Sequence, residues 1–189
     1  MKFISFLLNK EAKFGIINNE TITDLTGKIS GANSLKALIE NKGIPEAKKY
    51  ASQNAGNIGL NDIEYLPLIP NPGKIICVGL NYSEHVKETN RTVEENPVVF
   101  HRFPESQTAH KQAIQRPIAS HSLDYEGEMA VIMGEGGKHI KPEEALKHII
   151  GYSCYNESTI REWQRHTRQF GMGKNFEKTG SFGPHMVLA

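Results

Sequence analysis

The sequence lacks any long hydrophobic run, since no stretch of 18 consecutive apolar residues occurs in its 189 residues. A helix that spans a membrane needs about 20 such residues, so we expect neither a membrane span nor a membrane partner. The apolar run at residues 3–8 is too short for a secretion signal, and polar residues follow it at once. The default expectation is therefore a cytoplasmic protein.

The net charge is close to zero, and the sequence has few cysteines. The 22 Lys and Arg residues nearly balance the 21 Asp and Glu residues, so the formal net charge is +1. This balance argues against a nucleic-acid partner that is bound through a broad basic surface. The two cysteines, Cys77 and Cys154, lie in separate apolar segments and form no CxxC or Cys/His cluster. We expect two buried free thiols in a reducing compartment and no zinc site.

The length suits one domain with a small appendage. Residues 1–68 are predicted to form a small β-rich module, because short apolar runs alternate with turn-forming residues as in an antiparallel meander. A helix is predicted at residues 34–43, where Ser34 can cap its start and Gly43 can end it. The proline-rich segment 66–74 is a plausible linker to a second part, residues 73–189.

The second part is predicted to be mainly β, which makes the fold class α+β. Apolar runs and turn-forming residues predict strands at residues 74–80, 97–103, 123–133 and 152–155. Helices are predicted at 141–151, ended by Gly151, and at 156–170, and the long polar connection 104–120 is predicted to be a site loop.

Three acids, Asp124, Glu126 and Glu128, occupy alternate positions of one predicted strand, so their side chains share one face. Taken alone, this pattern fits a solvated strand face equally well. Gly127 between the glutamates would let another group approach the backbone closely, and the strand turns apolar at Met129. Carboxylates at the edge of a core need a cation or raised pKa values.

A divalent cation would satisfy these acids. Hard oxygen ligands at alternate positions of one strand suit Mg²⁺, Mn²⁺ or Ca²⁺. Glu157, which follows the next predicted strand, offers a further carboxylate. A pair of acids with this spacing is a weak signal by itself, and its surroundings decide what it means.

Those surroundings resemble a known family. Five segments, in this order, look like the catalytic domain of the fumarylacetoacetate hydrolase family: residues 78–88, 100–110, 123–140, 148–167 and 173–184. The resemblance covers about residues 73–189 and implies a mixed β-roll and a homodimer. Because the family domain normally continues through further strands, we also expect the fold to be incomplete at its C-terminal end.

The resemblance implies a site for Mg²⁺ or Mn²⁺, with Ca²⁺ as another possibility, whose ligands are Glu126, Glu128 and Glu157. The family usually has an Asn-Asp pair where this chain has Asn156 and Glu157, so the third ligand is longer by one methylene group. This difference bears on the coordination geometry, because Mg²⁺ demands a near-ideal octahedron.

The same resemblance implies catalytic and substrate-binding roles. His85 would act as a general base oriented by Glu88, and Lys174 would face the negative charge that develops on the substrate. Arg161 and Gln164, three residues apart, would line the substrate pocket from one helical face.

The implied reaction is metal-dependent hydrolysis of a carbon–carbon bond in a small 2-oxo or 1,3-dioxo acid of the acylpyruvate or fumarylacetoacetate type. One alternative is a decarboxylase or a hydratase/isomerase of 2-oxo acids in aromatic catabolism, since the same stabilisation of an enolate serves these reactions. Another is an inactive truncated paralogue or binding module.

Overall fold

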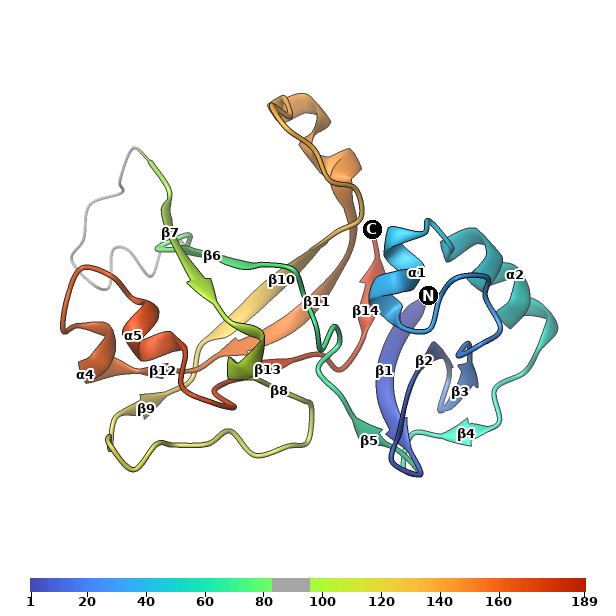
Figure 1. The fold of residues 1–189 in the computed structure, drawn as a ribbon, viewed down its shortest axis with the longest axis horizontal. Helices are drawn as coiled ribbons and strands as arrows, with labels where there is room; N and C mark the ends of the chain where they lie inside the picture. The colour runs from blue at the N-terminus through green and yellow to red at the C-terminus, as the bar shows by residue number, and fades with distance from the viewer. Residues whose placement is uncertain (83–95) are drawn as a thin grey trace.

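The computed structural model describes residues 1–82 and 96–189 (Figure 1). The strands are β1 (Lys2–Leu8), β2 (Glu11–Asn18), β3 (Thr21–Asp24), β4 (Ile58–Gly59), β5 (Glu64–Tyr65), β6 (Ile75–Gly79), β7 (Val98–Arg102), β8 (Gln107–Thr108), β9 (Leu123–Asp124), β10 (Gly127–Met133), β11 (Ile149–Glu157), β12 (Thr159–Ile160), β13 (Gly180–Phe182) and β14 (Met186–Leu188). The α-helices are α1 (Leu35–Glu40), α2 (Ile44–Gln53), α4 (Arg161–Gln164) and α5 (Gly171–Lys174), and 3₁₀ helices occupy Pro104–Ser106 and Pro142–His148. The prediction of a mainly β fold with a few short helices is confirmed.

Antiparallel pairing of β1 with β2 and of β2 with β3 forms the predicted N-terminal meander. The hydroxyl of Ser34 accepts a hydrogen bond from the backbone N–H of Ala37, so it caps α1 as predicted. Gly43 does not end this helix, because α1 stops at Glu40 and Gly43 is the N-terminal cap of α2. No helix in the described part of the chain is long and apolar enough to cross a membrane.

One large sheet connects the first and second predicted parts of the chain. Its order is β4-β3-β2-β1-β14-β11-β13-β8, with β10 added to β11 and β5 added to β1. The apolar core spans the same junction, since Phe3 and Phe14 belong to one cluster with Tyr155, Phe182 and Met186. The division into residues 1–68 and 73–189 stays a prediction, because the sheet and its core are common to both parts.

The helix predicted at residues 141–151 is wrong at its C-terminal end. A 3₁₀ helix covers Pro142–His148, and Ile149 already begins β11, the strand that carries the chain to the site. Gly151 is buried inside this strand, opposite Ile132 of β10 and Leu188 of β14. A Cβ atom at Gly151 would collide with the backbone oxygen of Val187, so the glycine permits close strand pairing instead of ending a helix.

Two further elements are shorter than predicted. The predicted strand at 123–133 is split into β9 and β10, because Tyr125 and Glu126 lie between them. The helix predicted at 156–170 is reduced to α4, and β12 pairs with β9 just before it. This early strand pairing fixes the backbone up to Ile160, so the helix begins one residue later, at Arg161.

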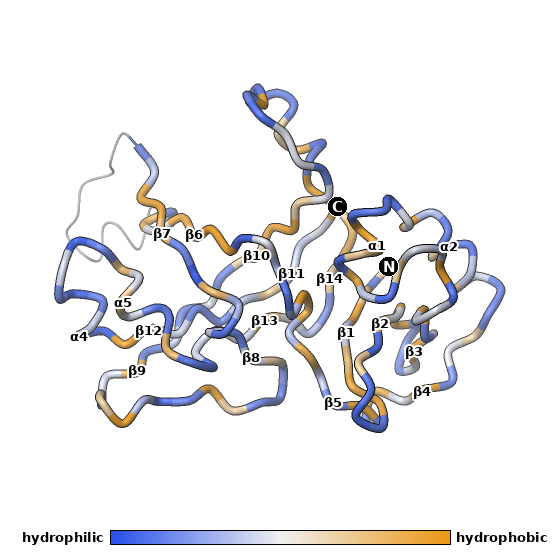
Figure 2. The backbone as a smooth tube through the Cα atoms, viewed as in Figure 1, coloured by the Kyte–Doolittle hydropathy of each residue, from blue (hydrophilic) through white to orange (hydrophobic). Residues whose placement is uncertain are grey.

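Hydrophobic residues occur along β6 and β7, as the orange stretches of these strands show (Figure 2). Ile76 and Val78 of β6 and Val99 of β7 are each about half exposed on a two-stranded sheet. The expectation of two buried thiols is wrong for Cys154, which is exposed on β11, whereas Cys77 on β6 is partly buried.

Candidate metal and substrate site

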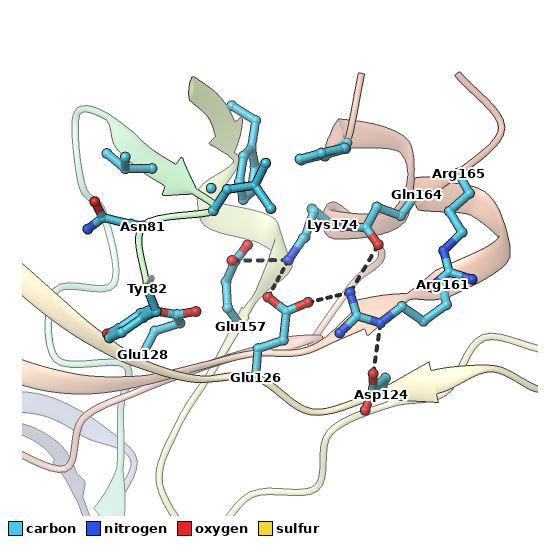
Figure 3. A pocket seen from close by; sticks show the side chains of 15 residues that line it. Asn81, Tyr82, Asp124, Glu126, Glu128, Glu157, Arg161, Gln164, Arg165 and Lys174 are labelled. Carbon is cyan, nitrogen blue, oxygen red and sulfur yellow. Dashed lines mark hydrogen bonds and ion pairs between the residues drawn. The ribbon is translucent and has the colours of Figure 1, made fainter. Parts of the chain in front are cut away.

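Two antiparallel strands bring the predicted acids together. Glu126 immediately precedes β10, Glu128 is its second residue, and Glu157 is the last residue of β11. The register pairs Gly127 with Asn156, and the backbone N–H of Glu157 donates a 2.8 Å hydrogen bond to the backbone oxygen of Glu126. The three carboxylates therefore project from neighbouring points of one sheet into the same space (Figure 3).

The three carboxylates form a compact cluster. One oxygen from each of Glu126, Glu128 and Glu157 lies within 4.8 Å of the others. The side chain of Glu157 is 8% exposed and that of Glu126 is 20% exposed, so neither is fully solvated. Hard carboxylate oxygens at this spacing suit a divalent cation, and the residues present fit such an ion.

An ammonium group lies among these carboxylates. Lys174 is the last residue of α5, and its side chain is only 2% exposed. Its Nζ donates to Oε2 of Glu126 at 2.8 Å and to Oε2 of Glu157 at 3.0 Å. The ammonium also lies 5.1 Å from the centroid of the Phe100 ring, so it is enclosed by charge on one side and by an aromatic face on another.

A second cation, Arg161, borders the cluster at the start of α4. Its Nε donates to Oδ2 of Asp124 at 2.7 Å, and its Nη1 lies 2.7 Å from Oε1 of Glu126. The same Nη1 donates to the side-chain oxygen of Gln164 at 3.0 Å. Asp124 is therefore not a fourth member of the acidic cluster, because it anchors Arg161 from β9.

A third cation, Arg102 of β7, contacts Glu157. Its Nη1 is 3.4 Å from Oε1 of Glu157, whereas Lys174 contacts the other oxygen, Oε2. Sequence reasoning missed both this residue and the anchoring role of Asp124. The available signal was a lone arginine two positions after Phe100 on an apolar strand, which places it on the same buried face.

Burial raises the pKa of two of the carboxyls. For Glu128, burial is the largest cause, and repulsion from Glu157 and Glu126 adds to it. For Glu157, burial is again the largest cause and raises the pKa more than the nearby ammonium of Lys174 and guanidinium of Arg102 lower it. Both groups therefore hold a proton more readily than an exposed glutamate does.

The pKa of Glu126 moves in the opposite direction. Burial is the largest single influence and favours the neutral form, but the charge of Lys174, hydrogen bonds from Lys174 and Thr159, and the charge of Arg161 together outweigh it. The pKa of Glu126 is consequently lowered, so this carboxyl loses its proton more readily than those of Glu128 and Glu157 do.

A cavity of about 280 Å³ opens above these groups. The end of β6 and the residues after it, including Asn81 and Tyr82, form one wall, and α4 and α5 form another (Figure 3). The volume is slightly below the usual range for drug-sized ligands, which suits a small substrate.

Six of the eight predicted site residues line this one cavity: Glu126, Glu128, Glu157, Arg161, Gln164 and Lys174. The other two, His85 and Glu88, lie outside the described residues. Their roles as base and orienting acid stay predictions, as do the functional roles of the six.

Comparison with known proteins identifies the family. Residues 74–189 match the family described as fumarylacetoacetate (FAA) hydrolase C-terminal. The chain belongs to the fumarylacetoacetate hydrolase family. Among curated relatives, it is 35% identical over 143 residues to a mitochondrial oxaloacetate tautomerase, fahd2, of Xenopus laevis. That match covers 75% of this chain and 45% of the relative, so the chain spans less than half of the relative's length.

Two solved structures support the fold. The fumarylacetoacetate hydrolase of Exiguobacterium antarcticum matches with a TM-score of 0.78 and 30% identity, over 100% of this chain and 66% of that one. A maleylpyruvate hydrolase from Sphingobium, solved with manganese(II) and pyruvate, matches with a TM-score of 0.79 over 100% of this chain and 67% of that one. At 19% identity, the second likeness concerns the fold alone.

Proposed function

We propose that this chain carries the metal- and substrate-binding site of an enzyme that hydrolyses a carbon–carbon bond in small 2-oxo acids of the acylpyruvate type. The observation that carries the proposal is the convergence of three carboxylates in one cavity with Lys174 and Arg161. Family membership supports an enzymatic role, and the reaction itself is our inference.

Glu126, Glu128 and Glu157 would hold a divalent cation, with Mg²⁺ or Mn²⁺ as our proposal. When bound, such an ion supplies Lewis-acid stabilisation of negative charge on the oxygens of a 2-oxo acid. The family usually has aspartate where this chain has Glu157, but the longer side chain still reaches the cluster, within 4.8 Å of the other two carboxylates.

Lys174 would have two alternative roles. In the structure its ammonium neutralises Glu126 and Glu157. Once another cation neutralises these carboxylates, the ammonium can donate a hydrogen bond to a substrate oxygen that becomes negative when the carbon–carbon bond breaks. Because the side chain is almost fully buried and lines the cavity, this donor stays at the cavity wall.

Arg161 would bind the substrate carboxylate. Asp124 holds its Nε and Gln164 accepts from its Nη1, which orients the guanidinium. Within residues 1–82 and 96–189, no acceptor bonds to its Nη2, so this edge can donate to a ligand in the cavity. A planar donor fork of this kind recognises carboxylates well.

Hydrolysis also needs an activated water molecule. We assign this step to His85, oriented by Glu88, which would take the proton as water adds to the carbonyl next to the bond that breaks. The electron pair of that bond passes into the 2-oxo acid fragment, where Lys174 faces the resulting charge.

A second candidate reaction is keto–enol tautomerisation of oxaloacetate, favoured by the name of the Xenopus relative. This reaction moves one proton and breaks no carbon–carbon bond, so it needs the charge stabilisation of the cluster but no water. Decarboxylation or isomerisation of a 2-oxo acid would use the same groups, whereas an inactive binding module would turn over nothing.

Turnover assays with and without MnCl₂ separate these possibilities. We expect the chain to release pyruvate from acetylpyruvate only with the metal, and Glu126→Gln to abolish this activity. The matched control is Glu177→Gln, which changes a side chain that is 73% exposed. Metal-dependent ketonisation of oxaloacetate without acetylpyruvate cleavage would establish the tautomerase instead. Failure to turn over either compound would contradict the enzyme proposal and support a binding module.

A further inference from the structure

Every nitrogen of the Arg102 guanidinium makes a polar contact inside the protein. Nε donates to the hydroxyl of Ser106 at 3.2 Å, and Nη2 donates to the hydroxyl of Thr179 at 2.8 Å. Nη1 donates to the backbone oxygen of Ser158 at 3.2 Å and lies 3.4 Å from Oε1 of Glu157. These contacts tie β7 to the end of β11, where the third acidic ligand is located.

This buried charge has one acidic partner in the part of the chain that the structure describes. Arg102 is 2% exposed, and its only ion pair there is with Glu157. An arginine cannot escape the cost of burial by losing its proton, so its charge must be compensated by neighbours. The guanidinium carbon also lies 5.8 Å from the centroid of the Tyr155 ring. Such enclosure fixes the guanidinium in one position beside Glu157.

The two oxygens of Glu157 consequently have different partners. Oε1 faces Arg102, and Oε2 accepts from Lys174 on the side of the acidic cluster. The Ser158 carbonyl that binds the same guanidinium nitrogen belongs to the next residue in the chain, so Arg102 grips both the side chain and the backbone beside it. Movement of the Glu157 side chain away from Arg102 would break its contact with Nη1.

We propose that Arg102 is a positioning residue that presents Glu157 to a bound cation through one oxygen only, and that it thereby favours Mg²⁺ and Mn²⁺ over Ca²⁺. The inference rests on the metal site of the proposed function. Ca²⁺ takes six to eight ligands and accepts carboxylates through both oxygens, whereas the smaller ions need about six ligands in an octahedron. With Oε1 held by Arg102, Glu157 offers the ion one oxygen instead of two, which suits the lower coordination number of Mg²⁺ and Mn²⁺.

The test measures the binding of MnCl₂ and CaCl₂ separately by calorimetry and compares the ratio of the two dissociation constants. Both ions carry the same charge, so the loss of the arginine charge changes both affinities similarly, and the ratio isolates the coordination geometry. We expect Arg102→Gln to reduce the preference for Mn²⁺ over Ca²⁺ by about tenfold, the usual size of an effect from a partner of a metal ligand. Arg168→Gln, at an exposed arginine, is the matched control and should leave the ratio unchanged.

Two milder variants keep the test decisive if Arg102→Gln does not fold, which circular dichroism would show. Arg102→Lys retains the charge but not the fork of donors, and Thr179→Val removes only the 2.8 Å anchor of Nη2. Both should shift the ratio toward Ca²⁺, with the smaller shift for Thr179→Val. A wild-type ratio in every folded variant would overturn the role of Arg102. Binding of neither ion by the wild-type chain would instead contradict the proposed metal site.

Discussion

Replacing Lys174 by methionine tests whether its ammonium is the internal counter-ion of the acidic cluster. Methionine keeps most of the apolar stem but removes the ammonium, which lies over the Phe100 ring and binds Glu126 and Glu157. Glu157 then loses its shortest contact with a cation, and Glu126 keeps only its ion pair with Arg161, inside a site where both carboxylates are largely buried. We expect the metal-free variant to be less stable than the wild-type chain.

The size of the loss follows from burial. Removing one partner of a buried ion pair typically costs about 3–5 kcal/mol, because the other charge stays uncompensated. Here Glu157 can take up a proton, since its pKa is already raised by burial, which moves the expected loss to the lower end, about 3 kcal/mol. For a chain of this length, each kcal/mol shifts the melting temperature by about 2–4 °C, so the expected fall is roughly 6–12 °C.

The rise in melting temperature on adding MnCl₂ should be larger for the variant, although the variant is the less stable protein without metal. A cation at a thousandfold excess over its dissociation constant stabilises the folded state by about 4 kcal/mol. In the wild-type chain, the ammonium of Lys174 contacts Glu126 and Glu157 and therefore competes with a metal for these carboxylates. The Lys174→Met variant has no such competitor, so MnCl₂ should raise its melting temperature more than that of the wild-type chain.

Activity provides a third readout, since the variant should bind the metal and yet turn over little 2-oxo acid. Lys178→Met is the matched control, because that side chain is 47% exposed and its ion pair with Glu177 is 4.0 Å long. It should change the melting temperature very little. The counter-ion argument is refuted if Lys174→Met melts like the wild-type chain, or if MnCl₂ stabilises the two proteins equally.

Three further predictions concern the surroundings of the cluster. Asp124→Asn should loosen Arg161 and raise KM for a 2-oxo acid more than it lowers kcat, and a selective fall in kcat would contradict this. Alkylation at pH 8 should label the exposed Cys154 well before Cys77. Burial raises the pKa of Cys77 to about 12, which leaves a thiolate fraction on the order of 10⁻⁴ at this pH. Equal labelling rates of the two cysteines, measured by mass spectrometry, would disprove this prediction. Stabilisation by MnCl₂ should weaken as pH falls from 7.5 to 5, because the raised pKa of Glu128 lets protons compete with the metal. Without metal, the contribution of Glu128 to stability has the opposite pH dependence: a raised pKa in the folded state stabilises the protein at low pH, and this benefit is lost as pH rises. Thermal unfolding scans over this pH range, with and without MnCl₂, test both signs.

The acidic cluster was predictable because its members follow from strand periodicity. Glu126 and Glu128 are two residues apart, so they share a face, and Glu157 ends the next long strand. An antiparallel return brings the end of β11 beside the start of β10, as the register of Gly127 with Asn156 shows. Local pattern thus explains why these acids lie together, but it fitted a solvated strand face equally well, and the family resemblance was needed to assign them to a metal site. The same periodicity also put Asp124 on this face, where it pairs with Arg161 instead.

Contacts between distant segments were not predictable in the same way. Arg102 meets Glu157 across 55 residues and Thr179 across 77, and no local spacing encodes either contact. The prediction of a helix that ends at Gly151 was wrong for a related reason. Pairing with β10 and β14 stabilises residues 149–157 as a strand, so tertiary pairing overrides the helical pattern of the preceding residues.

The charges of the cavity link metal binding to substrate binding. In the described part of the chain, its lining has four acids and three bases, a formal charge of −1: Asp124, Glu126, Glu128 and Glu157 against Arg161, Arg165 and Lys174. A divalent cation would change this sum to +1. An anionic 2-oxo acid would thus meet a repulsive cavity without the metal and an attractive one with it, and Lys174 would be released from Glu126 and Glu157 in the same step. The charges of the cavity therefore favour binding of the metal before the substrate.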